Sequence, residues 1–124
     1  MSGIFLIDGI RLWLRRRSRE KKLRSALAWP LTTGEINHWE VVDADQEASS
    51  VGAMYQIEAG FHFTLNGEYF GGYLRSIAMG HHEAETKAKG NPTIHIRYDP
   101  ANPDTVAVLA EDNENQLPFR IVSG

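Results

Sequence analysis

Residues 61–73 read Phe61-His62-Phe63-Thr64-Leu65-Asn66-Gly67-Glu68-Tyr69-Phe70-Gly71-Gly72-Tyr73, with large apolar side chains at alternate positions before a central Asn-Gly pair. Alternation with a period of two is typical of a β-strand that buries one face. The pair Asn66-Gly67 supplies the two positive-φ positions of a type I′ turn. These residues are therefore predicted to form a β-hairpin.

A two-residue turn also fixes which residues of the hairpin face each other. Phe63 is predicted to lie opposite Phe70, as an aromatic cross-strand pair on the buried face. Phe61 is predicted to cover Gly72, and Tyr73 to cover Gly60, because an aromatic ring can shield a glycine on the facing strand. The hairpin is thus expected to be the structural centre of the protein.

The rest of the body has the signals of a small, mostly β domain. Strands are expected at residues 34–42, 53–65, 68–79, 93–98 and 105–110, with an edge strand at 117–122. A short helix is expected at 81–89, ended by Gly90, and a rigid turn at 99–104. The predicted fold is α+β, an antiparallel sheet of about five or six strands folded as a barrel or sandwich.

The chain begins with a segment that is apolar first and basic afterwards. Ile7, Ile10 and Leu14 follow helical spacing, which predicts one helix over residues 4–28 that ends before Pro30. The apolar run is too short to cross a bilayer, which requires roughly 20 residues. The positive charge follows the apolar run, whereas a secretory signal has it in front. We expect an N-terminal helix at 1–28 and one β domain at 29–124, in the cytoplasm.

The charge is divided unevenly between these two parts. Residues 1–29 carry eight basic and two acidic residues, a net +6, and the remainder carries −9. Three roles for the basic helix follow. It binds the inner face of the cytoplasmic membrane as an amphipathic helix, it packs on the β domain, or it binds nucleic acid. The acidic body disfavours nucleic acid. The predicted membrane or partner contacts are Phe5, Leu6, Trp13, Arg15, Arg16 and Arg17.

The residues that could carry chemistry do not form a recognisable site. The chain has no Cys, which excludes disulfides, zinc–thiolate sites and a cysteine nucleophile. His81 and Glu85 lie one helical turn apart, and His62 and His95 would form a two-histidine site only if their strands paired. The carboxylates are scattered on loops, without an acid–base pair. We therefore predict no catalytic, metal or cofactor-binding residues.

Several motifs resemble those of the bacterial family known as domain of unknown function 3592, over residues 28–110. The first motif is Trp29-Pro30-Leu31-Thr32-Thr33-Gly34-Glu35-Ile36, with Trp29, Pro30 and Gly34 as its characteristic residues. The second is the hairpin, with Phe63, Asn66, Gly67 and Phe70. The third is Ile96-Arg97-Tyr98-Asp99-Pro100-Ala101-Asn102-Pro103, with Tyr98, Pro100 and Pro103. The chain departs from the family at Gly90-Asn91-Pro92-Thr93-Ile94 and in lacking a long N-terminal transmembrane segment. The resemblance implies a fold, structural roles for these residues and frequent membrane association, and it implies no reaction.

These observations favour a non-enzymatic accessory or interaction domain. The face or the edge of its sheet would bind a protein partner, and its N-terminal helix would hold it at the membrane. The alternatives are a small enzyme or metal-binding protein that uses the histidines, and a nucleic-acid-binding protein that uses the basic helix. No feature of the sequence indicates which oligomeric state the protein has.

Overall fold

The computed structural model describes residues 19–44 and 54–124. The predicted contacts Phe5, Leu6, Trp13 and Arg15–Arg17 lie outside these residues. Residues 19–26 are helical and are called here the N-terminal helix. The other elements are β1 (Leu31–Asp43), β2 (Tyr55–Leu65), β3 (Glu68–Ser76), α2 (His81–Lys87), β4 (Thr93–Asp99), β5 (Asn102–Ala107), the 3-10 helix η1 (Ala110–Asn113) and β6 (Ile121–Val122).

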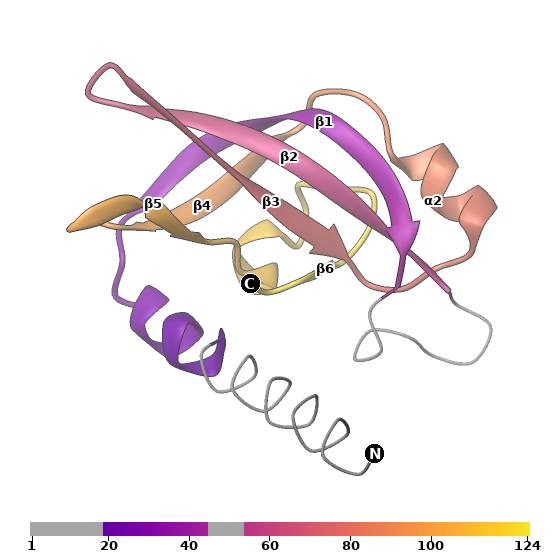
Figure 1. Ribbon diagram of the computed structural model, residues 1–124, viewed down its shortest axis with the longest axis horizontal. Helices are drawn as coiled ribbons and strands as arrows, with labels where there is room; N and C mark the ends of the chain where they lie inside the picture. Colours follow the sequence, from indigo (N-terminus) through magenta and orange to yellow (C-terminus); the bar gives the residue numbers. More distant parts are fainter. Residues whose placement is uncertain (1–18, 45–53) are drawn as a thin grey trace, which may run out of the picture.

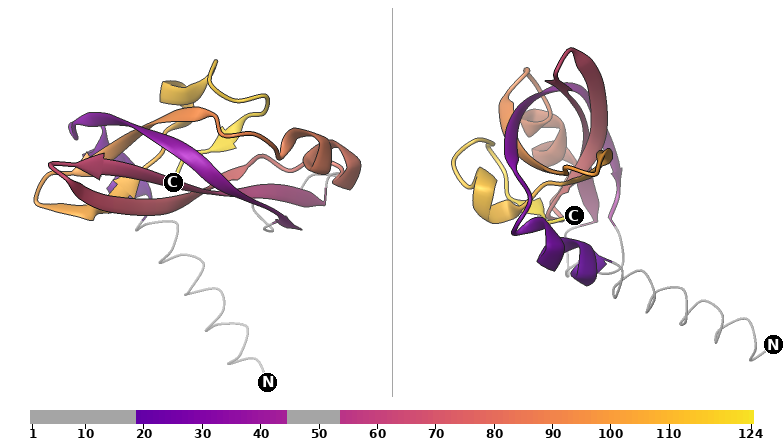
Figure 2. Two further views of the ribbon diagram at one scale, coloured as in Figure 1. Left: turned by 90° about the horizontal axis from the view of Figure 1, so that it is seen from above. Right: turned by 90° about the vertical axis from the view of Figure 1, so that its left-hand side faces the viewer.

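The six strands form one antiparallel sheet in the order β5-β4-β1-β2-β3-β6 (Figure 1). The sheet curls into a half-barrel, as the view along its length shows (Figure 2). Its two edges meet just beyond β5 and β6, where Val108 N–H donates to Gly124 O at 2.8 Å and Gly124 N–H donates to Val108 O at 3.2 Å. The expected mostly β fold of about six strands is confirmed.

Strand β1 gives the sheet its curl because it changes partner along its length. It pairs with β4 through Leu31–Glu35 and with β2 through Glu35–Asp43, with a register shift between Ile36 and His38. The extra residue at this bulge explains the imperfect alternation of the sequence here. Gly34 stands beside the crossing, where an added Cβ would overlap the Ile96 side chain and lie 2.7 Å from His62 O. Only glycine fits at this position.

The hairpin has the predicted turn and register. Asn66 and Gly67 have φ angles of 50° and 84°, and the rings of Phe63 and Phe70 stack with centroids 5.5 Å apart. The inward side chains of β2 join those of β1 and β4 in one core, whose largest fully buried apolar members are Phe63, Ile36, Ile57, Ile94 and Ile96. The alternation of residues 61–73 therefore separates a core face from an outer face.

Several element boundaries differ from the prediction; β1 begins at Leu31 and not at residue 34, and α2 ends at Lys87 and not at residue 89. Strand β3 ends at Ser76 and not near residue 79, because Ile77 N–H bonds to Arg120 O and the chain returns to β2 only as an isolated bridge at Met79. Strand β5 begins at Asn102 and includes Pro103, which an edge strand tolerates. Strand β6 is two residues long, because residues 117–119 form bends in which Phe119 turns into the core.

The described end of the basic segment packs on the β domain. Leu23, Ala26 and Trp29 contact Ala107 and Leu109 in a small second apolar cluster. This docking partly buries Lys22, and the burial lowers the pKa of its ammonium group.

Arg97 of β4 binds the C-terminal end of the N-terminal helix. It donates from Nη1 to Leu27 O at 2.9 Å and forms a bidentate pair with Asp112 at 2.8 and 3.0 Å. The hydrogen bonds that Arg97 donates to the Asp112 carboxylate raise the pKa of its guanidinium group. Within residues 19–44 and 54–124, no helix is long and apolar enough to span a bilayer.

Candidate functional site

The outer face of β1, β2 and β3 carries the most exposed aromatic side chains of the described residues. Tyr69 and Tyr73 are 68% and 70% exposed, although both belong to the central hairpin. The pleat places them on the side of β3 opposite to Phe70 and Leu74, which face the core. We call this surface, made of the outward residues of β1–β3, the outer face.

Each tyrosine is held against the sheet by a neighbour. The ring of Tyr69 stacks on His62 with centroids 5.0 Å apart and an interplanar angle of 17°. The His62 Nδ1 atom is buried and has no hydrogen-bond partner in the described part of the chain. Tyr73 lies over Gly60, where an added Cβ would be 3.4 Å from its Cε1 atom and 3.2 Å from His38 Cβ. The glycine therefore leaves room for the ring to lie on the strand.

Carboxylates flank the aromatic residues. Glu58 pairs with Arg75 at 3.1 Å on neighbouring strands, and this ion pair is partly exposed. Glu40 lies directly opposite Glu58 in the β1–β2 ladder, and Glu35 lies directly opposite His62. Glu35 and Glu40 are exposed, and neither has an ion-pair partner among residues 19–44 and 54–124. The outer face is thus aromatic along β3 and acidic along β1.

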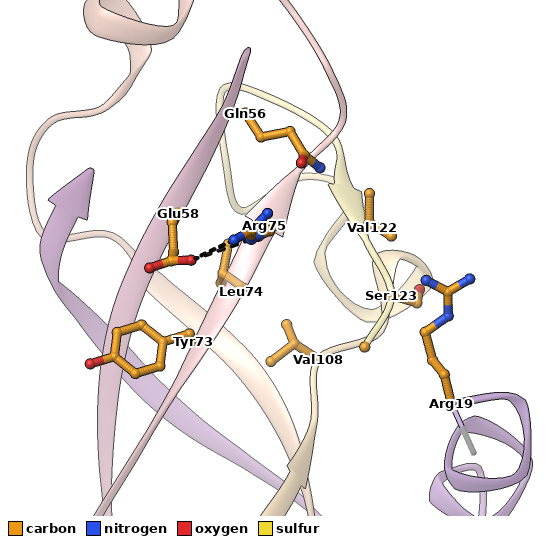
Figure 3. A pocket seen from close by; sticks show the side chains of 10 residues that line it. Arg19, Gln56, Glu58, Tyr73, Leu74, Arg75, Val108, Val122 and Ser123 are labelled. Atoms are coloured by element: carbon orange, nitrogen blue, oxygen red, sulfur yellow. Dashed lines mark hydrogen bonds and ion pairs between the residues drawn. The ribbon is translucent and has the colours of Figure 1, made fainter. Parts of the chain in front are cut away.

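A hollow of about 340 Å³ borders the outer face where β3 meets β6. Its lining includes Tyr73, the Glu58–Arg75 pair, Val108 and, from the N-terminal helix, Arg19. Figure 3 shows the Tyr73 ring and the Glu58 carboxylate on the same side of the hairpin, with Arg19 across the hollow. The hollow therefore lies between the outer face and Arg19 of the N-terminal helix.

The structure separates the histidines of the sequence. His81 Nε2 lies 3.3 Å from Glu85 Oε1 on α2, and both side chains are exposed. The strands of His62 and His95 do not pair, because β1 lies between β2 and β4, so the two-histidine arrangement does not occur. No three His, Asp or Glu residues in the described part of the chain are grouped closely enough to hold a metal ion.

Two buried polar arrangements were not anticipated from the sequence. Gln56 and Ser76 join β2 to β3 inside the sheet, since Gln56 Nε2 donates to Ser76 O at 2.7 Å and Ile57 N–H donates to Ser76 Oγ at 2.8 Å. Asn113 in η1 accepts from His95 N–H at 2.8 Å and donates to His95 O and Leu109 O, each at 3.0 Å. The first arrangement joins β2 to β3 and the second joins η1 to β4, and Gln56 also lines the hollow that borders Tyr73.

The residues predicted to be structural occupy the core and its turns. Tyr98 stacks near Phe63 with centroids 6.4 Å apart, and Ala101 N–H bonds to Asp99 Oδ1 at 2.9 Å in the turn that contains Pro100. Pro30 O accepts from Tyr98 N–H at 3.2 Å. The exposed pair Tyr69 and Tyr73 was not singled out as a site, although the alternation of residues 61–73 already places both opposite to the core face.

No protein-family model, curated protein or solved structure matches the chain.

Proposed function

We propose that the protein is a non-enzymatic interaction domain that binds a protein partner through its outer face. The supporting observation is the exposure of the Tyr69 and Tyr73 side chains, at 68% and 70%, on the outer face of β3. Tyrosine is enriched at protein interfaces and at their energetic hot spots. The proposal places binding on the sheet face and not on a sheet edge, because both exposed tyrosines stand on the face of β3 opposite to the core.

Affinity purification with matched variants tests this proposal. The double variant Tyr69→Ser/Tyr73→Ser is expected to lose a partner that the wild-type protein retains, because it removes both exposed rings. The control is Leu31→Ser/Met54→Ser, which removes two other exposed apolar side chains, 51% and 66% exposed. A partner retained equally by all three proteins would show that the outer face is not the binding surface.

We also propose that the basic N-terminal segment holds the domain at an anionic membrane surface. Lys21 and Arg24 on the docked N-terminal helix are exposed, next to Leu27, which is 58% exposed. Each basic residue close to an anionic bilayer contributes about 1 kcal/mol. Lys21→Ala/Arg24→Ala is therefore expected to weaken binding to phosphatidylserine vesicles roughly 30-fold. Equal sedimentation of wild type and variant with phosphatidylserine vesicles would contradict the proposal. So would a wild-type protein that binds phosphatidylcholine vesicles as strongly as phosphatidylserine vesicles.

A further inference from the structure

We infer that the outer face binds a cationic, Arg/Lys-rich polypeptide segment. The inference rests on the proposed function and adds the chemistry of the partner. Charge is its first support: the outer face carries the carboxylates of Glu35, Glu40 and Glu58, and the only described cation paired with them is Arg75. Residues 30–124 as a whole carry a net charge of −9. Both charges favour encounter with a cationic segment.

The second support is a cross-strand pair of like charges. Glu40 and Glu58 face each other directly on the outer face, and like charges directly opposite on neighbouring strands destabilise a sheet. Arg75 compensates Glu58 at 3.1 Å and leaves Glu40 with no described partner. A cationic side chain of a bound segment placed beside Glu40 would supply the missing counter-charge.

The third support is the presentation of the tyrosine rings. Tyr73 covers Gly60 and Tyr69 stacks on His62, so each ring has one side occupied by the sheet. A guanidinium or ammonium group is attracted to the face of an aromatic ring, and Arg is the commoner partner. The two tyrosines are four residues apart on β3, a separation of about 13 Å. An extended segment lying along β3 would therefore meet them with cationic side chains at positions i and i+4.

Binding of a defined peptide to the full chain tests this inference. The probe is a fluorescent peptide of six Gly-Arg repeats, followed by anisotropy at low salt, and a peptide of six Gly-Glu repeats is the comparison. Tyr73→Ala is expected to weaken binding of the Gly-Arg peptide about two- to fivefold, and Tyr73→Phe is expected to preserve it, because the ring carries the attraction. Both variants change an exposed side chain, and their thermal unfolding is measured alongside.

A pair of variants with the same change of net charge separates the outer face from the acidic body in general. Glu40→Gln is expected to weaken binding of the Gly-Arg peptide about threefold. Glu114→Gln, an exposed substitution in the loop after η1, is expected to leave it unchanged. The inference would be overturned if Glu40→Gln and Glu114→Gln changed the affinity for the Gly-Arg peptide equally. It would also be overturned if Tyr73→Ala bound the peptide as tightly as the wild-type protein does.

The outcome also separates this inference from the proposed function. If the Gly-Arg peptide does not bind while Tyr69→Ser/Tyr73→Ser still releases the captured protein partner, the cationic chemistry is wrong and the interaction face stands. If the peptide does not bind and the double variant keeps its partner, both proposals fail. If the peptide binds with the expected dependence on Tyr73 and Glu40, the cationic partner is supported.

Discussion

Replacement of Asn113 tests how the C-terminal part of the chain is held on the barrel. The side chain is 3% exposed and makes three hydrogen bonds, to His95 N–H, His95 O and Leu109 O. Each buried hydrogen bond contributes about 0.5 to 1.5 kcal/mol net, and more is lost when the partner stays unsatisfied. Asn113→Ala is therefore expected to lower the free energy of unfolding by roughly 2 to 4 kcal/mol.

Urea denaturation measures this change, with Asn115→Ala as the control. Asn115 is an exposed asparagine in the turn that follows η1, and substitutions at such positions usually change stability by less than about 0.5 kcal/mol. With a denaturant slope of about 2 kcal/mol per M, in the middle of the usual range for small proteins, Asn113→Ala should lower the unfolding midpoint by roughly 1 to 2 M. A midpoint equal to that of Asn115→Ala would refute the assignment of three working hydrogen bonds.

The isosteric substitution Asn113→Asp adds a test by pH. The new carboxyl would point an oxygen at His95 O and Leu109 O, where the amide now donates. Burial and these carbonyl oxygens would raise its folded pKa above the unfolded value of about 3.9. The folded variant would then hold its proton more tightly than the unfolded chain. Its stability deficit relative to wild type should shrink as the pH falls from 7 towards 4.5, and a constant deficit would exclude this mechanism.

Three further substitutions follow from the fold. Gly34→Ala should lose roughly 1 to 3 kcal/mol of stability by overpacking, whereas Gly80→Ala, whose added Cβ would meet no atom within 4 Å, should stay near wild type. Equal unfolding midpoints of the two variants would contradict the close approach at Gly34. Phe63→Ala should cost about 3 to 5 kcal/mol, measured by thermal or urea unfolding, and a loss below about 1 kcal/mol would remove it from the core. Arg97→Met leaves Asp112 without its cation, so hydrogen exchange should accelerate in residues 19–29 more than in β2; a uniform acceleration would show that Arg97 does not specifically hold the N-terminal helix.

Local patterns in the sequence were sufficient for the hairpin and not for the curl of the sheet or the contact between its edges. Alternation and the pair Asn66-Gly67 determine strand, turn and register together, because a type I′ turn links two strands without a gap. The partner change of β1 between β4 and β2 depends on contacts far apart in the chain, so no local pattern encodes it. The closure at Val108 and Gly124 is likewise a tertiary contact between short, irregular segments.

The candidate site was only partly predictable for the same reason. The alternation that buries Phe63 also directs Tyr69 and Tyr73 outward, so the aromatic half of the outer face follows from the hairpin alone. The acidic half does not, because Glu40 meets Glu58 only through the register of β1 after its bulge. Asn113 was missed because a single polar residue in a loop gives no sign that its side chain will be buried against β4.

The outer face concentrates several features that a sequence selected only for stability would avoid. Two tyrosines about 70% exposed, an imidazole nitrogen buried without a described partner and a like-charge pair across two strands all lie on β1–β3. The core face of the same strands is mostly apolar, with Phe63 and Ile57 fully buried, and its buried Ser76 is hydrogen-bonded. Local departures from stable design tend to fall at functional sites. Their grouping on the outer face supports the proposal that this face binds a partner.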